Sequence, residues 1–229
     1  MKKLIETIKN IFKIEELRKR ILFTLALILV YRFGSFVVIP GINPESLSAL
    51  QQQVEGNGLM GLLNIFSGGA FSNASIFALG IMPYISASIV IQLMGIVVPY
   101  FQKLQKEGES GRRKINQWTR YLTIIVLLLQ GPAYLANLHA QLPDAAFVLG
   151  RGSVLFTIGA TIVLIAGTMF VMWLGEKITD KGIGNGVSLI IMVGIIARLP
   201  HALMAELNTR FTEATGGLVM LVVELVLLF

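Results

Sequence analysis

Long apolar stretches dominate this chain and constrain its fold more than any other feature. Five of them approach the roughly 20 apolar residues that a helix needs to cross a membrane. Because 55% of the residues are hydrophobic and only 14% are charged, a water-soluble domain would leave large apolar patches exposed, and disorder is equally disfavoured. The sequence therefore predicts an all-α integral membrane protein, a polytopic helical bundle. The five predicted spans are 21–39, 76–98, 121–138, 153–174 and one from Val187 to about residue 199.

The last part of the chain is interrupted and then apolar again. Arg198 and Pro200 interrupt the fifth stretch, although it could continue beyond them. Another apolar run occupies residues 216–229. We interpret 216–229 as the truncated start of a sixth span, since a membrane protein rarely ends within a span.

Lysine and arginine lie almost entirely on one side of the predicted spans. Segments 1–20, 99–120 and 175–186 hold 15 of the 19, against three on the other side and Arg32 inside the first span. Since basic loops are retained in the cytoplasm, this asymmetry predicts a cytoplasmic N-terminus. A cleaved signal peptide is disfavoured, because the first apolar run is long and contains Arg32.

Two segments do not read as spans. Residues 1–20 have apolar residues at helical spacing on one face and lysines on the other, which predicts an amphipathic helix on the membrane surface; a solvated tail is the alternative. Residues 57–75 are apolar, rich in Gly and Ser and too short to cross. They form either a re-entrant helix, which must be surrounded by protein or a water-filled cavity, or an ordinary external loop.

The second predicted span contains Pro83, which is expected to kink its helix. Ile81 and Ile85 share a face of this span, and spacing alone places them against lipid or a neighbouring helix. Ser86 and Gln92 are polar groups at membrane depth, where they either bond to adjacent helices or line a wet path.

Signatures of catalysis and cofactor binding are missing. The chain has no HExxH motif, no carboxylate pair inside a span and no cysteine, so an enzyme is disfavoured. The run GIGNG at 182–186 lacks the preceding strand of a dinucleotide-binding unit, and we expect a tight turn there. The basic segment 106–114 either enforces topology or docks to a polyanion or an acidic partner surface.

Four sequence segments closely resemble segments of the SecY family, whose members are the central subunit of the bacterial protein-conducting channel. The resemblance implies the first half of a ten-span inverted-repeat channel and part of span six. The four segments are YRFGSFVVIPGI (31–42), NIFSGGAFSNASIFALGIMPYISASIVIQL (64–93), KEGESGRRK (106–114) and WLGEKITDKGIGNG (173–186).

The resemblance also implies roles for particular residues. It maps a plug, which fills the channel from the outer side, onto about 57–75. It maps an apolar constriction ring onto Ile81, Ile85, Val187 and Ile191, with Val187 smaller than the Ile that the family often has. The second and third spans would form one side of a lateral gate. The implied plug residues are Asn64, Ile65, Phe66, Ser67, Gly68, Gly69, Ala70 and Phe71, and the implied partner-docking residues are Lys106, Arg112, Arg113 and Lys114.

The function implied by the resemblance is a pore that passes unfolded secretory polypeptides across the bacterial cytoplasmic (inner) membrane and releases membrane segments laterally into lipid. Implied partners are the SecE and SecG subunits, the SecA motor ATPase or a translating ribosome, through which rRNA could contact the chain, and the secretory polypeptide; no cofactor or metal is implied. The alternative is half of a small-solute secondary transporter, which also uses broken helices. Such a transporter should carry a polar site at mid-membrane, and these spans offer little of one.

Overall fold

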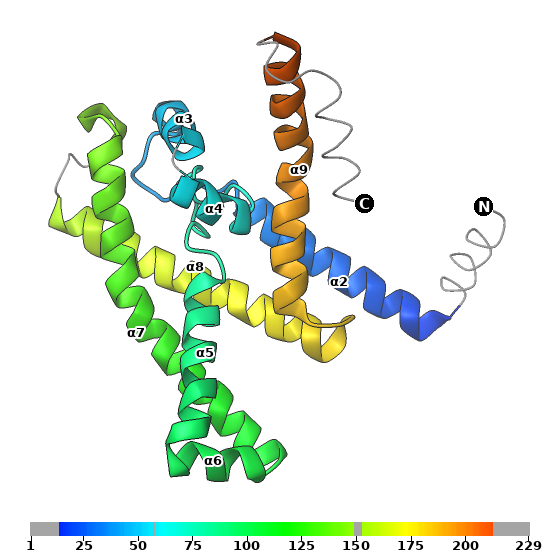
Figure 1. The fold of residues 1–229 in the computed structure, drawn as a ribbon. Coiled ribbons are helices and arrows are strands. Elements are labelled where there is room, and N and C mark those ends of the chain that lie inside the picture. Colours follow the sequence, from blue (N-terminus) through cyan, green and yellow to red (C-terminus); the bar gives the residue numbers. More distant parts are fainter. Residues whose placement is uncertain (1–13, 57, 149–152, 213–229) are drawn as a thin grey trace.

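A computed structural model describes residues 14–56, 58–148 and 153–212 (Figure 1). This part of the chain is helical and contains no strand; two isolated bridges pair Val38 with Ser75 and Ile42 with Phe147. The elements are α2 (Glu15–Gly34), the 3-10 turn η1 (Pro44–Ser46), α3 (Leu47–Gly56), α4 (Gly58–Phe66), α5 (Met82–Val97), α6 (Pro99–Lys106), α7 (Glu109–Gln141), the 3-10 turn η2 (Asp144–Ala146), α8 (Val154–Lys181) and α9 (Gly186–Thr212).

Two of the described helices, α7 and α8, are each long and apolar enough to cross a membrane. The pair α5 and α6 also qualifies if it is one span, but the chain bends by 99° between them. In α9 the apolar part, Gly186–Pro200, is shorter. For α2 and α9 the expectation of a full span therefore stays a prediction.

The first two predicted spans have different limits in the structure. Helix α2 begins at Glu15 and so includes residues 15–20, whereas most of the predicted surface helix, residues 1–13, lies outside the described residues. It ends at Gly34, and Val38 then bridges Ser75. Helix α5 begins only at Met82, with Pro83 in its first turn. A proline there removes no helical hydrogen bond, so the predicted kink at Pro83 was wrong.

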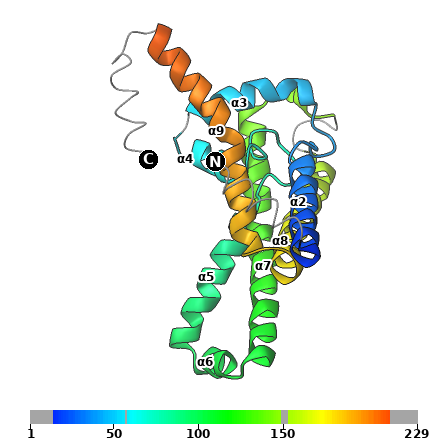
Figure 2. The ribbon, with the colours of Figure 1, turned by 90° about the vertical axis from the view of Figure 1, so that its right-hand side faces the viewer.

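The basic segment 99–120 is mostly helical, and the expectation of a loop there was wrong. Helix α6 connects the far ends of α5 and α7, so that the three form a hairpin extending away from the rest of the molecule (Figure 2). Phe101 and Leu104 of α6 are buried in a small cluster with Ile91 of α5. The hairpin thus carries its own hydrophobic contacts, and its basic residues stand on helices.

The expected tight turn at 182–186 is confirmed. Gly184 has a φ of +69°, a left-handed conformation that favours glycine. The Asn185 side chain accepts hydrogen bonds from the backbone N–H groups of Val187 and Ser188, and it thereby caps α9. Helix α9 then continues through Arg198 and Pro200 to Thr212, so neither residue ends it.

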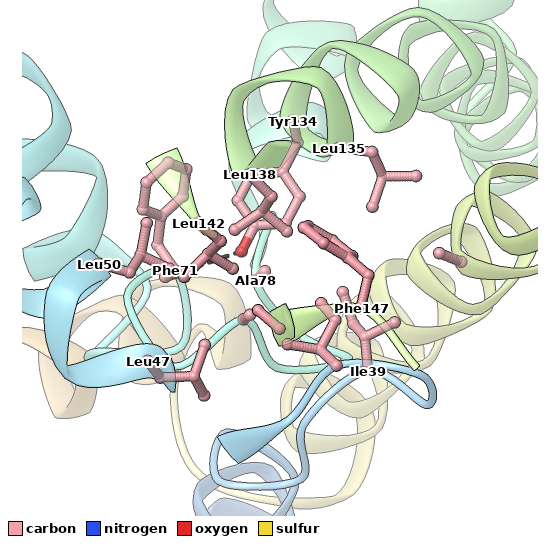
Figure 3. Close-up of a cluster of buried hydrophobic side chains, with 14 of the residues drawn as sticks. Ile39, Leu47, Leu50, Phe71, Ala78, Tyr134, Leu135, Leu138, Leu142 and Phe147 are labelled. Carbon is pink, nitrogen blue, oxygen red and sulfur yellow. Dashed lines mark hydrogen bonds between the residues drawn. The ribbon is translucent and has the colours of Figure 1, made fainter. Parts of the chain in front are cut away.

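Two hydrophobic clusters hold the described part of the chain together. The first gathers residues of α3, α7 and η2 around the chain near Ile39 and Phe71 (Figure 3). The second joins α2 and α8, which pack along each other, to the start of α5 and the start of α9. The segment between α4 and α5 contributes Phe71 to the first cluster and Ala70 to the second. That segment is therefore the link between the two cores.

Candidate pore and plug

The segment that resembles the plug is a short helix followed by a compact series of turns. Helix α4 ends at Phe66, and turns occupy residues 67–81 up to the start of α5. Six of the eight implied plug residues are buried; the exceptions are Ile65 and Phe66 on α4. The segment is thus enclosed by protein, which is the environment that a re-entrant segment requires. Residue 57 lies outside the described residues.

Asn64 organises the turns internally. Its side-chain Oδ1 accepts a hydrogen bond from the N–H of Ser72 at 3.1 Å, and its carbonyl accepts one from the N–H of Gly69 at 2.8 Å. The Ser67 hydroxyl accepts a hydrogen bond from the N–H of Phe71. The bond from Gly69 satisfies a carbonyl near the end of α4, and the other two satisfy the N–H groups of Phe71 and Ser72 within the turns. Because Asn64 is 2% exposed, the turns depend on a buried polar network.

Two tyrosines from different helices anchor the turns from outside. The Tyr31 hydroxyl of α2 donates to the carbonyl of Ser67 at 3.2 Å. The Tyr134 hydroxyl of α7 donates to the carbonyl of Phe71 at 2.9 Å, and the two rings meet edge to face at 5.0 Å (Figure 3). Each of these buried carbonyls also accepts a backbone hydrogen bond at 3.3 Å, from the N–H of Ala70 and of Ala74 respectively, so the tyrosines add a second donor that ties the turns to α2 and α7.

Two arginines also reach the turns. Arg32 of α2 donates to the carbonyl of Gly68, and its guanidinium carbon lies 4.9 Å from the centre of the Phe36 ring. Arg198 of α9 donates to the Ser72 hydroxyl at 2.9 Å. The sequence marked Arg32 as a charge inside a span and Arg198 as an interruption, but it gave no partner for either. An ionisable residue inside a predicted span was the available signal.

The turns approach α9 backbone to backbone. The Cα atoms of Gly68 and Gly194 lie so close that a Cβ added at Gly68 would be 2.9 Å from the Gly194 Cα. A Cβ added at Gly194 would be 3.1 Å from the carbonyl oxygen of Phe66. Small residues permit such close packing between elements of membrane proteins. The pair of glycines therefore fixes how near α9 stands to the turns.

The structure brings the four implied ring residues into one cluster. Ile81 precedes α5 and is buried, while Ile85, Val187 and Ile191 are half-buried at the edge of the same cluster. Ala70 of the plug-like segment belongs to this cluster too. Residues that are far apart in the sequence thus form one apolar surface beside the turns. Their role as a constriction ring stays a prediction.

A polar cavity of about 640 Å³ leads to this surface. Val187 of the implied ring lines it, and so do Arg112 and Arg113 of the implied docking group. Its lining also includes Tyr84, Asn116, Asn185 and Asp180, as well as Arg120 and Glu176, which form a two-point ion pair between α7 and α8. Sequence reasoning missed these last residues, because only the packing of α7 against α8 and α5 places them together.

The implied docking group divides in the structure. Arg112 and Arg113 line the polar cavity, whereas Lys106 ends α6 and Lys114 pairs with Glu107 at 3.6 Å. All four side chains are exposed. The two arginines therefore belong to the polar cavity and the two lysines to the hairpin tip, and their role in docking stays a prediction.

A second cavity, of about 360 Å³, is mainly apolar and lies between α4, α5 and α7. Its lining includes Met60 and Leu63 of α4, Met82 of α5, and Gln130 and Tyr134 of α7. Ser86 lines it as well, but the Ser86 hydroxyl donates within α5, to the carbonyl of Met82. Within the described residues, no group of three or more His, Asp or Glu side chains is placed to hold a metal ion.

Comparison with known proteins agrees with this arrangement. The SecY family model matches residues 75–229. The chain is 50% identical over 188 residues to the protein translocase subunit SecY of Escherichia coli K12. This aligned region covers 82% of the chain and 42% of that protein. It is 45% identical over 223 residues to the SecY subunit of Halalkalibacterium halodurans (97% and 50%) and 46% identical over 198 residues to that of Streptomyces scabiei (84% and 45%).

The chain spans about half the length of the curated relatives it matches. These relatives are named as protein translocase subunits, and none of the three bears the name of a small-solute transporter. A family match over 155 consecutive residues, together with apolar helices able to span a membrane, identifies a multi-pass helical membrane protein. The chain belongs to the SecY family.

Proposed function

We propose that this chain forms one side of a protein-conducting channel, through which unfolded secretory polypeptides cross the bacterial cytoplasmic membrane. One observation carries the proposal: Ile81, Ile85, Val187 and Ile191 share an apolar cluster with Ala70 of the plug-like turns, and Val187 also lines the polar cavity. A polar entrance, an apolar constriction and a removable block are the three parts that such a channel needs.

The chemistry of the ring suits a substrate of changing sequence. Apolar contact has no direction, so isoleucine and valine can close around any side chain without binding it tightly. A narrow apolar constriction also excludes water and ions by dewetting. With no chain present, the plug fills the space beside the ring and completes the seal.

The apolar cavity between α4, α5 and α7 supports lateral release. Helices α5 and α7 are the second and third predicted spans, which the resemblance assigns to one side of the gate. A translocating segment of about 20 apolar residues gains free energy when it leaves a wet pore for lipid. The other side of the gate, the remaining ring residues and the SecE and SecG subunits would complete the channel.

Energy for transport would come from a cytoplasmic partner, the SecA motor ATPase or a translating ribosome. The exposed Arg112 and Arg113 would meet that partner at the polar cavity, with the N-terminus on the same, cytoplasmic side. Positive charge at a cavity mouth attracts acidic protein surfaces and RNA alike.

Site-directed photocrosslinking in the full-length channel tests the ring. A crosslinker at Ile81 or Ile191 should capture a stalled secretory chain, because both side chains border the pore. A crosslinker at Leu129, which is 73% exposed on α7 and lines neither cavity described above, is the control and should capture lipid. Failure at both ring positions, in channels that still translocate, would contradict the proposal.

Charge reversal tests the docking site. We expect the double substitution Arg112→Glu and Arg113→Glu to weaken binding of the motor or the ribosome, with the larger loss at low salt, where screening is weak. Lys103→Glu on α6, which is exposed outside the polar cavity, is the matched control. If the reversal changes only the membrane topology of the chain, the segment enforces orientation and docking lies elsewhere.

A further inference from the structure

Two arginines from helices far apart in the sequence converge on the turns that follow α4. Arg32 of α2 donates to the carbonyl of Gly68, and Arg198 of α9 donates to the Ser72 hydroxyl at 2.9 Å. The two acceptors are four residues apart. Both guanidinium groups also line a small hollow of about 260 Å³ with Gly68 and Gly69.

The position of these arginines is informative because burying a cation within a membrane protein costs free energy. Such residues are therefore rare and are usually paired with a polar group. The Gly68 carbonyl lies just beyond the C-terminal end of α4, where helical carbonyls without partners carry partial negative charge. A guanidinium group there gains a charge-assisted hydrogen bond and favourable interaction with the helix dipole. Arg32 thus satisfies the end of α4, and Arg198 holds the far side of the same turn.

We propose that Arg32 and Arg198 are plug-positioning residues, which together form a two-point clamp on the closed plug. The proposal rests on the proposed function, since it assumes that the segment is a plug that leaves its place during transport. The clamp ties the plug to α2 on one side and to α9 on the other. Movement of either helix away from the turns therefore weakens the hold on the plug.

The glycine contact gives the clamp its geometry. Because Gly68 and Gly194 meet without side chains, α9 stands close enough for Arg198, one helical turn further along, to reach Ser72. A methyl group at Gly194 would press on the carbonyl of Phe66 and on the N–H of Gly68. Gly194→Ala should therefore displace the plug without removing any polar partner.

Cysteine labelling measures the plug directly, since this chain has no cysteine of its own. In the full-length channel, with cysteine removed from the other parts, Ala70→Cys places a thiol where the side chain is fully buried. We expect Arg198→Gln or Arg32→Gln to raise the rate of labelling by a water-soluble maleimide roughly tenfold, the scale of one charge-assisted hydrogen bond. Resting ion conductance should rise in parallel. Arg18→Gln, an exposed arginine at the other end of α2, should change neither.

A second set of variants protects the test from misfolding. Ser72→Ala removes the acceptor of Arg198 and leaves α9 intact, and it also removes the hydrogen bond that the Ser72 hydroxyl donates to the Gly69 carbonyl, so its effect should be at least that of Arg198→Gln. The double variant should be no worse than Ser72→Ala alone, because Ser72→Ala already breaks the bond to Arg198. Additive effects would overturn the pairing of Arg198 with Ser72.

Deletion of residues 61–72 separates failure of the clamp from failure of the plug itself. If the deletion raises conductance while the arginine variants behave like Arg18→Gln, the clamp is refuted and the plug stands. If the deletion leaves conductance unchanged, the proposed plug function is refuted. If deletion and arginine variants all leak, and the arginine substitutions add nothing to the deletion, the clamp acts through the plug as proposed.

Discussion

The plug-like turns and the hairpin of α5, α6 and α7 are built in opposite ways. The turns have almost no regular structure and are buried, with anchors from α2, α7 and α9. The hairpin is almost entirely helical, and α6 makes its main contacts with α5 and α7 (Figure 2). The turns are held by other parts of the molecule, whereas the tip of the hairpin is held by contacts within the hairpin.

The difference teaches which segment is suited to move. Several polar contacts of the turns come from single side chains on separate helices, so a shift of those helices releases them one by one. The hairpin has a local apolar cluster of Ile91, Phe101 and Leu104, which stays intact when neighbouring helices move. If the turns are a plug, as proposed, they are the segment suited to move, and the tip of the hairpin is the segment suited to stay fixed.

The largest expected effect comes from breaking the hairpin at Gly111. A side chain there would overlap the carbonyl of Leu104, which is backbone and cannot move aside cheaply. We expect Gly111→Val to lower the free energy of unfolding by at least about 3 kcal/mol, measured by thermal unfolding of the purified channel. Gly159→Val on α8 makes the same change within a helix at a position where a Cβ meets open space, and it is the control. Equal unfolding temperatures for the two variants would show that the hairpin is not closely packed.

An intermediate effect is expected at Tyr134. Tyr134→Phe keeps the ring against Phe71 and removes one of the two hydrogen bonds to the buried carbonyl of Phe71, a loss of about 1 kcal/mol. Labelling of Ala70→Cys should speed up accordingly, and the apolar contacts of α6 with α5 should be unaffected. Tyr121→Phe, an exposed tyrosine on the same helix, should leave the labelling rate unchanged. If both variants label alike, the tyrosine anchor contributes nothing to holding the turns.

The smallest effect is expected where the hairpin meets α8. Arg120 and Glu176 are both partly exposed, so Arg120→Gln should cost between zero and about 1 kcal/mol of stability, and less at high salt. A double-mutant cycle with Glu176→Gln, read by thermal unfolding, isolates the pair. A coupling energy well above 1 kcal/mol would mean that the hairpin depends on α8 for its stability.

Sequence patterns predicted the parts of the fold that local chemistry determines. The apolar runs marked the middle of α7 and α8, and the glycines at 182–186 marked the turn before α9. The start of α5 was misplaced, because the pairing of Val38 with Ser75 keeps residues 76–81 out of the helix. The helices within the basic segment 99–120 were not predicted, although Phe101 and Leu104 give α6 a buried face.

The residues of the candidate site were predicted only from the resemblance to a known family. That resemblance implied the ring and plug residues, and the structure gathers the four ring residues and Ala70 of the plug-like turns in one cluster. The polar contacts of the plug could not be predicted, since Arg32 and Gly68 are separated by 36 residues and Arg198 and Ser72 by 126. No periodicity within one helix encodes a partner on another.

The meeting of Gly68 and Gly194 also has a consequence for the order of events when the plug moves. Attraction between two backbones that touch falls away within about an ångström of separation, so this contact acts like a rigid seat. An arginine side chain is long and flexible, and it can follow its partner over a greater distance. A departing plug would therefore leave its seat first and its arginine tethers last. When the plug returns, the arginine hydrogen bonds would form before the glycine contact does. The same two side chains that hold the plug closed would therefore also direct it back to its closed position.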